Sequence, residues 1–277
     1  MSKTALLQKI FYRPLLKGLI PLVNQILTRS RKKVRTRLIW DNSIQRYLLM
    51  ENNQLINVDV MPSWLICKSG LYKTVNRINL RHKELKEGSV VIDLGAGTGT
   101  ESIVFSEMVG KSGKVYAIEA HPETYCSLSH LVDKGFYTNV TPVNLAIGDR
   151  DGEVMIEDQQ AHEKNAVVIE DNKRDSGFKV KMITLDQMVE EFGIKKIDFL
   201  KVNIEGAEKY MLDGMVKSAS IIESAAISCH DFLYPNGGPE IMNAVRAFFK
   251  DRGFEVIHEP NDHVVVNSWI YFKRKSS

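Results

Sequence analysis

A glycine-rich turn that directly follows a short apolar run constrains the fold of this chain more than any other feature. The run Ser89–Leu94 is rich in β-branched residues and has the pattern of a buried strand. It leads into Asp93-Leu94-Gly95-Ala96-Gly97-Thr98-Gly99, and a helical pattern over Thr100–Val109 follows. Glycines at such a turn let the backbone come close to a ligand that side chains would exclude. We therefore expect Gly95, Ala96, Gly97 and Gly99 to form a ligand-binding loop.

From this strand to the end of the chain, strand-like and helix-like segments alternate. The alternation predicts an α/β, Rossmann-like domain over residues 86–277, with a seven-stranded, mostly parallel sheet and helices on both faces. Thr184-Leu185-Asp186-Gln187 has the pattern of a capping box that starts a helix. The other expected elements are strands Lys114–Glu119, Asn139–Leu145, Ile197–Asn203, Ile221–Ser228, Phe254–His258 and Val264–Phe272, a hairpin of Glu153–Ile156 with Phe178–Ile183, and helices Pro122–Lys134 and Pro239–Arg252.

The first 85 residues differ from the rest in charge and pattern. Between Met1 and Trp40 there are ten Lys or Arg residues and no acid, so the rest of the chain has a formal charge of −7. We expect a basic, mainly helical extension, with a helix over Arg37–Glu51. Its apolar leader is interrupted by Pro14 and Pro21 and is too broken to span a membrane. Two alternatives stay open for residues 1–37: an anchor on an anionic membrane surface, or packing against the domain or a second copy in a homo-oligomer.

The cysteine content argues against a disulfide framework or a zinc site. Cys67, Cys126 and Cys229 are odd in number, far apart and without CxxC spacing. No set of His, Cys and carboxylate residues has a clear metal-ligand spacing. We therefore expect a cytoplasmic protein, peripheral to the membrane if the leader is an anchor. No metal ligands are predicted, and the use of a divalent cation stays an open alternative.

A second acidic residue supports a nucleotide site. Glu119 closes the next strand, 26 residues after Asp93, where its carboxylate can accept hydrogen bonds from an adenosine ribose, and Ala120 follows it. A dinucleotide-binding enzyme is the alternative, but its G-x-G-x-x-G pattern needs a third glycine where Thr100 stands. The Asp93 carboxylate would also repel a pyrophosphate and attract a positively charged sulfonium or amino group.

The chain resembles the FkbM-type methyltransferase family in five consecutive segments. These are VVIDLGAGTG, GKVYAIEAHPET, NVTPVNLAIGDRDGEV, ITLDQM and IDFLKVNIEGAE, between about Ser89 and Met215. The resemblance implies a class I methyltransferase fold with S-adenosylmethionine as methyl donor. It also implies O-methylation of a sugar, glycolipid or small-metabolite hydroxyl. In the family, the strand end at Asn144 and Leu145-Ala146 contacts the adenine.

Two positions depart from the pattern of the family. Gly97 stands where the family usually has Asn, and this agrees with the general methyltransferase pattern. Asn203 stands where the family usually has Asp in its K-x-D-x-E-G turn. The second departure removes a carboxylate next to the expected chemistry.

Candidate catalytic residues lie where the fourth and fifth strands of the sheet end. Lys201, Asn203 and Glu205 occupy alternate positions and so point to one side, at the edge where open α/β sheets bind ligands. His230 ends the fifth strand at the same edge. Because a hydroxyl acceptor must lose a proton, we expect Glu205, His230 and Asn203 to take part in catalysis. The alternative is that these groups only cap the strand end, with Lys201 paired to a glutamate. We expect His121, His130 and His258 to be ordinary surface or helix residues.

Two further functions are alternatives. A nucleic-acid methyltransferase would use the basic leader, but the rest of the chain is net acidic and lacks the (D/N)PP(Y/F/W) tetrad of amino-group nucleic-acid methylases. A catalytically inactive donor-binding module would explain Asn203. We expect residues 1–85, 159–176 and 232–239 to recognise the acceptor, because loop chemistry does not follow from the fold.

Overall fold

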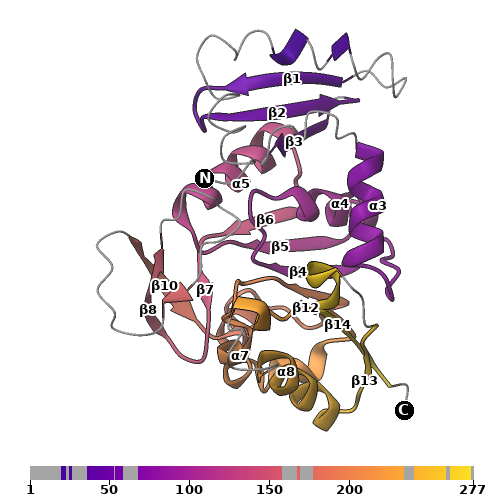
Figure 1. Ribbon diagram of the computed structural model, residues 1–277, viewed down its shortest axis with the longest axis vertical. Coiled ribbons are helices and arrows are strands. Elements are labelled where there is room, and N and C mark those ends of the chain that lie inside the picture. The colour runs from indigo at the N-terminus through magenta and orange to yellow at the C-terminus, as the bar shows by residue number, and fades with distance from the viewer. Residues whose placement is uncertain are drawn as a thin grey trace.

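Three sheets make up the framework of the protein. The computed structural model describes residues 20–22, 25–26, 36–52, 54–58, 68–157, 167–168, 177–233, 240–259 and 263–275. These residues form a central seven-stranded sheet, a three-stranded sheet beyond one end of it, and a four-stranded sheet at its side (Figure 1).

The central sheet consists of β4 (Val90–Leu94), β5 (Lys114–Ile118), β6 (Val140–Val143), β11 (Phe199–Val202), β12 (Ser224–Ser228), β13 (Phe254–Ile257) and β14 (Trp269–Arg274). Its strand order is β13-β14-β12-β11-β4-β5-β6. The strands from β12 to β6 are parallel, and β14 runs antiparallel to both of its neighbours. This arrangement confirms the predicted sheet.

Helices cover both faces of this sheet because successive residues of a strand point to opposite sides. On β4, Val91 packs with α3 (Lys68–Ile78), α4 (Thr100–Val109) and α5 (Pro122–Gly135). Ile92 packs with α6 (Leu185–Glu191), α7 (Glu208–Met211) and α8 (Glu240–Asp251) on the other face. The predicted capping box starts α6, where Thr184 and Gln187 exchange side-chain to backbone hydrogen bonds of 3.0 Å. Short 3₁₀ turns are η3 (Asp213–Met215), η4 (Ser218–Ile221) and η5 (Asp231–Leu233).

The predicted hairpin belongs to the four-stranded sheet. This sheet contains β7 (Ala146–Ile147), β8 (Gly152–Glu157), β9 (Val167–Val168) and β10 (Gly177–Ile183), in the order β7-β10-β8-β9. Strands β8 and β10 pair antiparallel, as predicted. Ile156 on β8 and Val180 on β10 pack with Ala146, and Ala120 lies against this cluster. The hairpin therefore stands beside the ends of β5 and β6 (Figure 1).

The helix predicted over Arg37–Glu51 is wrong. The segment forms two antiparallel strands, β1 (Thr36–Asp41) and β2 (Arg46–Glu51), and β3 (Gln54–Val58) completes a three-stranded sheet. Between β1 and β2, the Asp41 carboxylate accepts a hydrogen bond of 2.8 Å from Ser43 N, and Gln45 has a φ of 51°. Both features belong to a tight turn and interrupt a helix. The described part of the first 85 residues is therefore not mainly helical.

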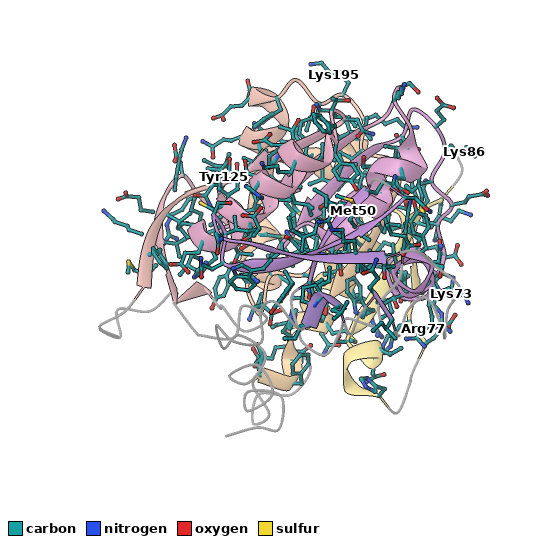
Figure 2. All side chains as sticks on the ribbon, turned by 90° about the horizontal axis from the view of Figure 1, so that it is seen from above. Met50, Lys73, Arg77, Lys86, Tyr125 and Lys195 are labelled. Carbon is teal, nitrogen blue, oxygen red and sulfur yellow. The ribbon has the colours of Figure 1, made fainter. Side chains whose placement is uncertain are left out.

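One face of the three-stranded sheet packs on the helices below it. Arg46 Nε donates a hydrogen bond of 2.9 Å to Ser127 Oγ of α5. Asn57 Nδ2 donates one of 2.7 Å to Thr98 O, within the glycine-rich turn. Met50 packs against this helical layer, whereas Lys73 and Arg77 of α3 are exposed (Figure 2). The sheet thus supports the turn after β4 directly.

The opposite face of the three-stranded sheet is also apolar. Ile20 is buried there in a cluster with Leu38, Tyr47, Leu49, Ile56 and Val58, whereas Leu22 and Ile26 are exposed. Most of residues 1–37 lie outside the described residues, so the membrane-anchor and packing alternatives both stay predictions. No helix in the described part of the chain is long and apolar enough to cross a membrane.

The last strand begins later than predicted. Val264–Asn267 forms a helical turn, α9, and β14 starts at Trp269. Trp269 pairs with Ser228, the last residue of β12. Because β12 ends at Ser228, the ladder between β12 and β14 begins at this pair.

Candidate active site

A cavity of about 310 Å³ lies at the carboxyl ends of β4, β5 and β11. Its volume is in the usual range for a small-molecule site. Six of the predicted donor-binding residues line it: Gly95, Ala96, Gly97, Glu119, Ala120 and Ala146. Two of the predicted catalytic residues, Asn203 and Glu205, line it as well. The structure thus brings the two predicted sets together in one cavity.

Gly95 lets two backbone segments meet at the floor of this cavity. Its φ is 72°, and a Cβ atom there would lie 1.9 Å from the backbone oxygen of Asn203. Its N–H donates a hydrogen bond of 3.0 Å to Ile118 O. The turn after β4 is thereby held between the ends of β5 and β11, and only glycine fits there.

Three predicted donor-binding residues lie behind the cavity wall. Asn144 Nδ2 donates to Glu119 O at 2.8 Å and to Ala120 O at 3.0 Å, so it braces the segment after β5. Gly99 precedes α4 with a φ of 92°, and a Cβ there would lie 2.7 Å from a Leu128 side-chain carbon. Asp93 is fully buried at the end of β4. These positions support the cavity without lining it.

Asp93 forms a buried ion pair with Lys201. Lys201 Nζ lies 2.8 Å from Asp93 Oδ1 and donates a hydrogen bond of 2.7 Å to Gly95 O. Ser102 Oγ donates one of 2.6 Å to Asp93 Oδ2. Burial by itself would lower the pKa of Lys201, but Asp93 and other nearby carboxylates raise it, so the ammonium stays charged. The alternative that pairs Lys201 with a glutamate is wrong, because Asp93 lies opposite Lys201 in the register of β4 and β11.

Glu119 presents its carboxylate at the cavity wall after β5. Oε2 accepts a hydrogen bond of 2.9 Å from Gly97 N, and Oε1 accepts one of 2.9 Å from His121 N. Burial raises the pKa of Glu119, and the two backbone N–H groups oppose this rise. Each oxygen can accept a further hydrogen bond, so the carboxylate can bind a pair of ligand hydroxyls.

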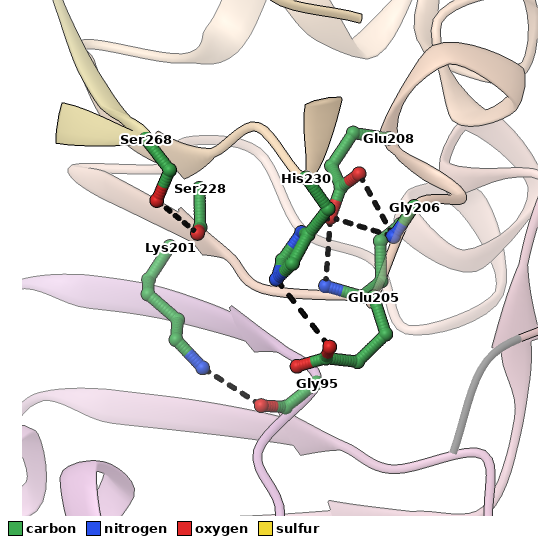
Figure 3. Close-up of polar contacts among 9 residues, drawn as sticks. Gly95, Lys201, Glu205, Gly206, Glu208, Ser228, His230 and Ser268 are labelled. Atoms are coloured by element: carbon green, nitrogen blue, oxygen red, sulfur yellow. Dashed lines mark hydrogen bonds and ion pairs between the residues drawn. The ribbon is translucent and has the colours of Figure 1, made fainter. Parts of the chain in front are cut away.

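Three side chains form a chain of polar contacts from the cavity into the interior (Figure 3). Glu205 lines the cavity, and its Oε2 lies 3.5 Å from His230 Nε2. His230 Nδ1 lies 2.7 Å from Glu208 Oε1. The side chain of Glu205 is 24% exposed, whereas those of His230 and Glu208 are 4% and 0% exposed. His230, predicted as catalytic, therefore reaches the cavity only through Glu205.

The charge on His230 depends on these two glutamates. Burial by itself would lower the pKa of His230, but hydrogen bonds and charge from Glu205 and Glu208 raise it to about 10. The imidazole is therefore protonated at neutral pH, with both ring nitrogens as donors.

Glu205 also has an unusual backbone. Its φ is 52°, and the next residue, Gly206, has a φ of 101°. A non-glycine residue in the left-handed region costs of order 1 kcal/mol and is often found where function fixes a side chain. The turn after β11 thus directs the Glu205 side chain at the expense of backbone strain.

Sequence reasoning missed several residues of this site. His121 was expected to be an ordinary surface or helix residue, but it is 1% exposed, caps the start of α5 and lines the cavity. Ile156 of the hairpin lines the cavity too. Its apolar alternation predicted a strand but did not show what the strand would face. The buried role of Glu208 was also missed.

No group of three or more His, Cys, Asp and Glu side chains arranged for a metal ion occurs in the described part of the chain. Cys126 and Cys229 are both free, and burial raises the pKa of the Cys229 thiol.

Sequence profiles of known families decide what kind of domain carries this cavity. The profile described as methyltransferase FkbM domain matches residues 93–256, more than half of the chain. The chain belongs to the FkbM methyltransferase family. This confirms the predicted family, a Rossmann-like fold, methyltransferase activity and S-adenosylmethionine as donor. A second profile, that of fibrillarin, matches residues 30–149.

Individual relatives of this FkbM methyltransferase are distant. Hexuronic acid methyltransferase AglP of Haloferax volcanii is 22% identical over 169 residues, which cover 61% of this chain and 67% of that protein. A protein-L-isoaspartate O-methyltransferase of Methanococcoides burtonii is 33% identical over 61 residues, 22% of this chain and 30% of that protein. A methyltransferase FkbM structure from Methylobacillus flagellatus KT has a TM-score of 0.46 and 18% identity, covering 76% of this chain and 52% of that chain. The chain thus spans only part of the length of these proteins.

The residues of the cavity fit the donor of the family. Gly97 has a φ of 56° and no atom within 4 Å of the place of a Cβ, so the turn leaves room beside the backbone. Glu119 offers acceptor atoms for ribose hydroxyls, and Ile118, Ile147 and Ile156 provide apolar surface for an adenine ring. Gly97, Glu119 and these three isoleucines would therefore hold S-adenosylmethionine.

Replacing Glu119 by alanine is expected to weaken binding of S-adenosylhomocysteine. The variant loses the charge-assisted hydrogen bonds to the ribose, which contribute about 1–3 kcal/mol. Isothermal titration calorimetry of the wild type and the variant measures the difference. Equal affinity, or tighter binding of NAD than of S-adenosylhomocysteine by the wild type, would contradict the assignment of Glu119.

Proposed function

We propose that the protein transfers a methyl group from S-adenosylmethionine to a hydroxyl group of a sugar, a glycolipid or a small metabolite. The observation that carries this proposal is Glu205, a carboxylate that lines the donor cavity on a strained turn. Methyl transfer to a hydroxyl needs a base within reach of the acceptor, and Glu205 is placed to be that base.

The expected reaction needs little else from the protein. Bound S-adenosylmethionine supplies an activated methyl group on a positively charged sulfur. The cavity aligns the acceptor oxygen with this methyl carbon, and alignment alone can account for much of the rate. As the oxygen forms its bond to carbon, its proton passes to Glu205 and the electron pair of the broken carbon–sulfur bond stays on sulfur. Asn203 also lines the cavity and is expected to hold the acceptor by hydrogen bonds.

The charge of the site supports a hydroxyl rather than a carboxylate as the acceptor. A carboxylate acceptor is already ionised at neutral pH and needs no base. It would also be repelled by the charged Glu205 side chain. The relative from Haloferax volcanii is named a hexuronic acid methyltransferase, and a hexuronic acid has both hydroxyl groups and a carboxylate. The site favours the hydroxyls.

Two matched glycosides test this proposal. We expect turnover of p-nitrophenyl β-D-glucoside and p-nitrophenyl β-D-glucuronide, measured as release of S-adenosylhomocysteine, because both carry sugar hydroxyls. Turnover of the glucuronide alone, which differs by its carboxylate, would contradict a hydroxyl acceptor. Donor binding without turnover on these acceptors would favour the inactive binding module.

Exposed apolar side chains next to the polar chain of contacts are expected to bind the acceptor. Phe232 is 41% exposed and Leu233 44% exposed, and the Phe232 ring lies 5.3 Å from the His230 ring. The Asp231 carboxylate fixes their position by accepting hydrogen bonds from Ile241 N at 2.7 Å and Met242 N at 3.0 Å. An aromatic face beside a polar site suits the apolar face of a sugar ring.

Replacing Phe232 by alanine is therefore expected to raise the KM for the glucoside. Burial of a phenylalanine side chain contributes about 1.5–3 kcal/mol, so the increase should be roughly tenfold or more. Steady-state kinetics gives this value, and calorimetry with S-adenosylhomocysteine should show unchanged donor affinity. Phe232→Tyr should retain most of the affinity. An unchanged KM in Phe232→Ala would place the acceptor elsewhere.

A nucleic-acid acceptor is the second candidate. The fibrillarin profile and a tRNA (adenine(58)-N(1))-methyltransferase subunit of Yarrowia lipolytica, 31% identical over 74 residues, favour it. The fibrillarin match ends at residue 149, before Glu205 and His230, so it covers the donor half of the domain. Transfer of labelled methyl groups to RNA, with no transfer to either glycoside, would decide for this candidate.

A further inference from the structure

Glu208 is a fully buried carboxylate with three hydrogen-bond partners. It accepts hydrogen bonds of 3.1 Å from Ile204 N and from Gly206 N, and its Oε1 lies 2.7 Å from His230 Nδ1. The two backbone bonds close the turn that bears Glu205 (Figure 3). Glu208 therefore fixes both the strained turn and the imidazole behind it.

His230 is placed between two carboxylates, with Glu208 at Nδ1 and Glu205 at Nε2. A neutral ring would leave the fully buried Glu208 carboxylate without a charged partner and would separate it from a second carboxylate, Glu205, that is 24% exposed. A protonated ring attracts both. The arrangement is therefore stable when the imidazole carries its positive charge.

Among the described residues, Glu205 and Glu208 are the charged groups that act most strongly on His230. Asp231 uses both carboxylate oxygens on the backbone N–H groups at the start of α8. Arg246 of α8 lies close enough to the Cys229 thiol to lower its pKa, but burial raises this pKa by more. The glutamates on either side remain the partners of the imidazole.

We propose that Glu208 and His230 are positioning residues that hold the Glu205 carboxylate aimed into the cavity, while His230 stays an imidazolium throughout the reaction. This rests on the proposed function, in which Glu205 is the base. His230 is not the base, because neither ring nitrogen is free to accept a proton and the ring does not line the cavity.

The imidazolium fixes the direction of the Glu205 side chain. Glu205 Oε2 lies 3.5 Å from His230 Nε2, and Glu208 holds Nδ1 of the same ring. Without the charged ring, Glu205 loses the contact that aims its carboxylate into the cavity. The loss should appear in kcat rather than in KM, because the acceptor proton is transferred in the transition state.

Nitrogen-15 NMR of the His230 ring tests the charge directly. In the wild type we expect the ring to lose its proton only near pH 10. In Glu208→Gln the midpoint should fall by about 1–3 pH units, because the closer carboxylate is lost. In Glu205→Gln it should fall by less, since that contact is 3.5 Å rather than 2.7 Å. The exposed Glu255→Gln is the matched control and should leave the midpoint unchanged.

The separate effects on kcat and KM with the glucoside distinguish positioning from a structural role. In His230→Gln we expect kcat to fall roughly tenfold or more, as part of the contribution of the base, with KM little changed. An unchanged kcat, or a wild-type ring that titrates at about 6.5 as a free histidine does, overturns the proposal. The NMR titration needs no acceptor, so it decides the role of His230 even if the proposed function fails. Glu205→Gln breaks no backbone hydrogen bond and keeps the titration available if Glu208→Gln does not fold.

Discussion

Replacing Glu205 by glutamine is expected to lower kcat about 100-fold or more, because a positioned general base typically contributes a factor of this size. Glutamine keeps the length and shape of the side chain but cannot take up the acceptor proton. Donor affinity should stay nearly unchanged, since the lost interaction acts only in the transition state. Single-turnover kinetics with the glucoside and calorimetry with S-adenosylhomocysteine measure the two quantities.

The matched control for this variant is Glu190→Gln, an exposed carboxylate on α6. It changes the net charge by the same amount and should leave kcat unchanged. Full activity of Glu205→Gln would show that alignment alone drives the transfer and that the site has no need of a base.

The largest effect on stability is expected for Lys201→Met. Methionine fills a similar volume but leaves the Asp93 carboxylate buried without its partner, which costs about 3–5 kcal/mol. Urea unfolding followed by circular dichroism gives the free energy of unfolding. Adding Asp93→Asn to this variant should restore part of the loss, because it removes the unpaired charge.

An ion pair with an exposed lysine, just before β11, provides the comparison. Lys196 Nζ lies 2.9 Å from Asp198 Oδ1, with the lysine side chain 57% exposed. Lys196→Met should cost less than about 1 kcal/mol, because water screens and solvates this pair. Equal losses in Lys201→Met and Lys196→Met would mean that the buried pair does not stabilise the turn after β4.

The sequence correctly predicted strands that are buried on both faces and helices that end at a glycine. The strand before the glycine-rich turn, α4 up to Gly110, and the capping box of α6 were all found as expected. In these places the local pattern and the tertiary structure demand the same residues. The pairing of Lys201 with Asp93 could not be predicted in the same way, because it depends on the register between β11 and β4.

The wrong helix prediction and the unpredicted burial of Glu208 have identifiable physical causes. The apolar residues of Arg37–Glu51 allow a helix as well as a strand, and the signal that decides is the turn around Asp41 and Ser43. Glu208 stands at the start of a short helix, a position that usually carries a solvated acid. Its burial follows from the position of His230, which lies just after β12 and far away along the chain, and one sequence does not show this contact.

The central claim is tested most directly by identifying the oxygen atom to which the methyl group is transferred. The protein is incubated with S-adenosylmethionine carrying a carbon-13 methyl group and with the two glycosides, and the products are examined by carbon–proton correlation NMR. The hydroxyl-acceptor mechanism with Glu205 as base predicts a methyl ether on a sugar carbon in both products. A methyl ester on the glucuronide with no ether on either glycoside would contradict it.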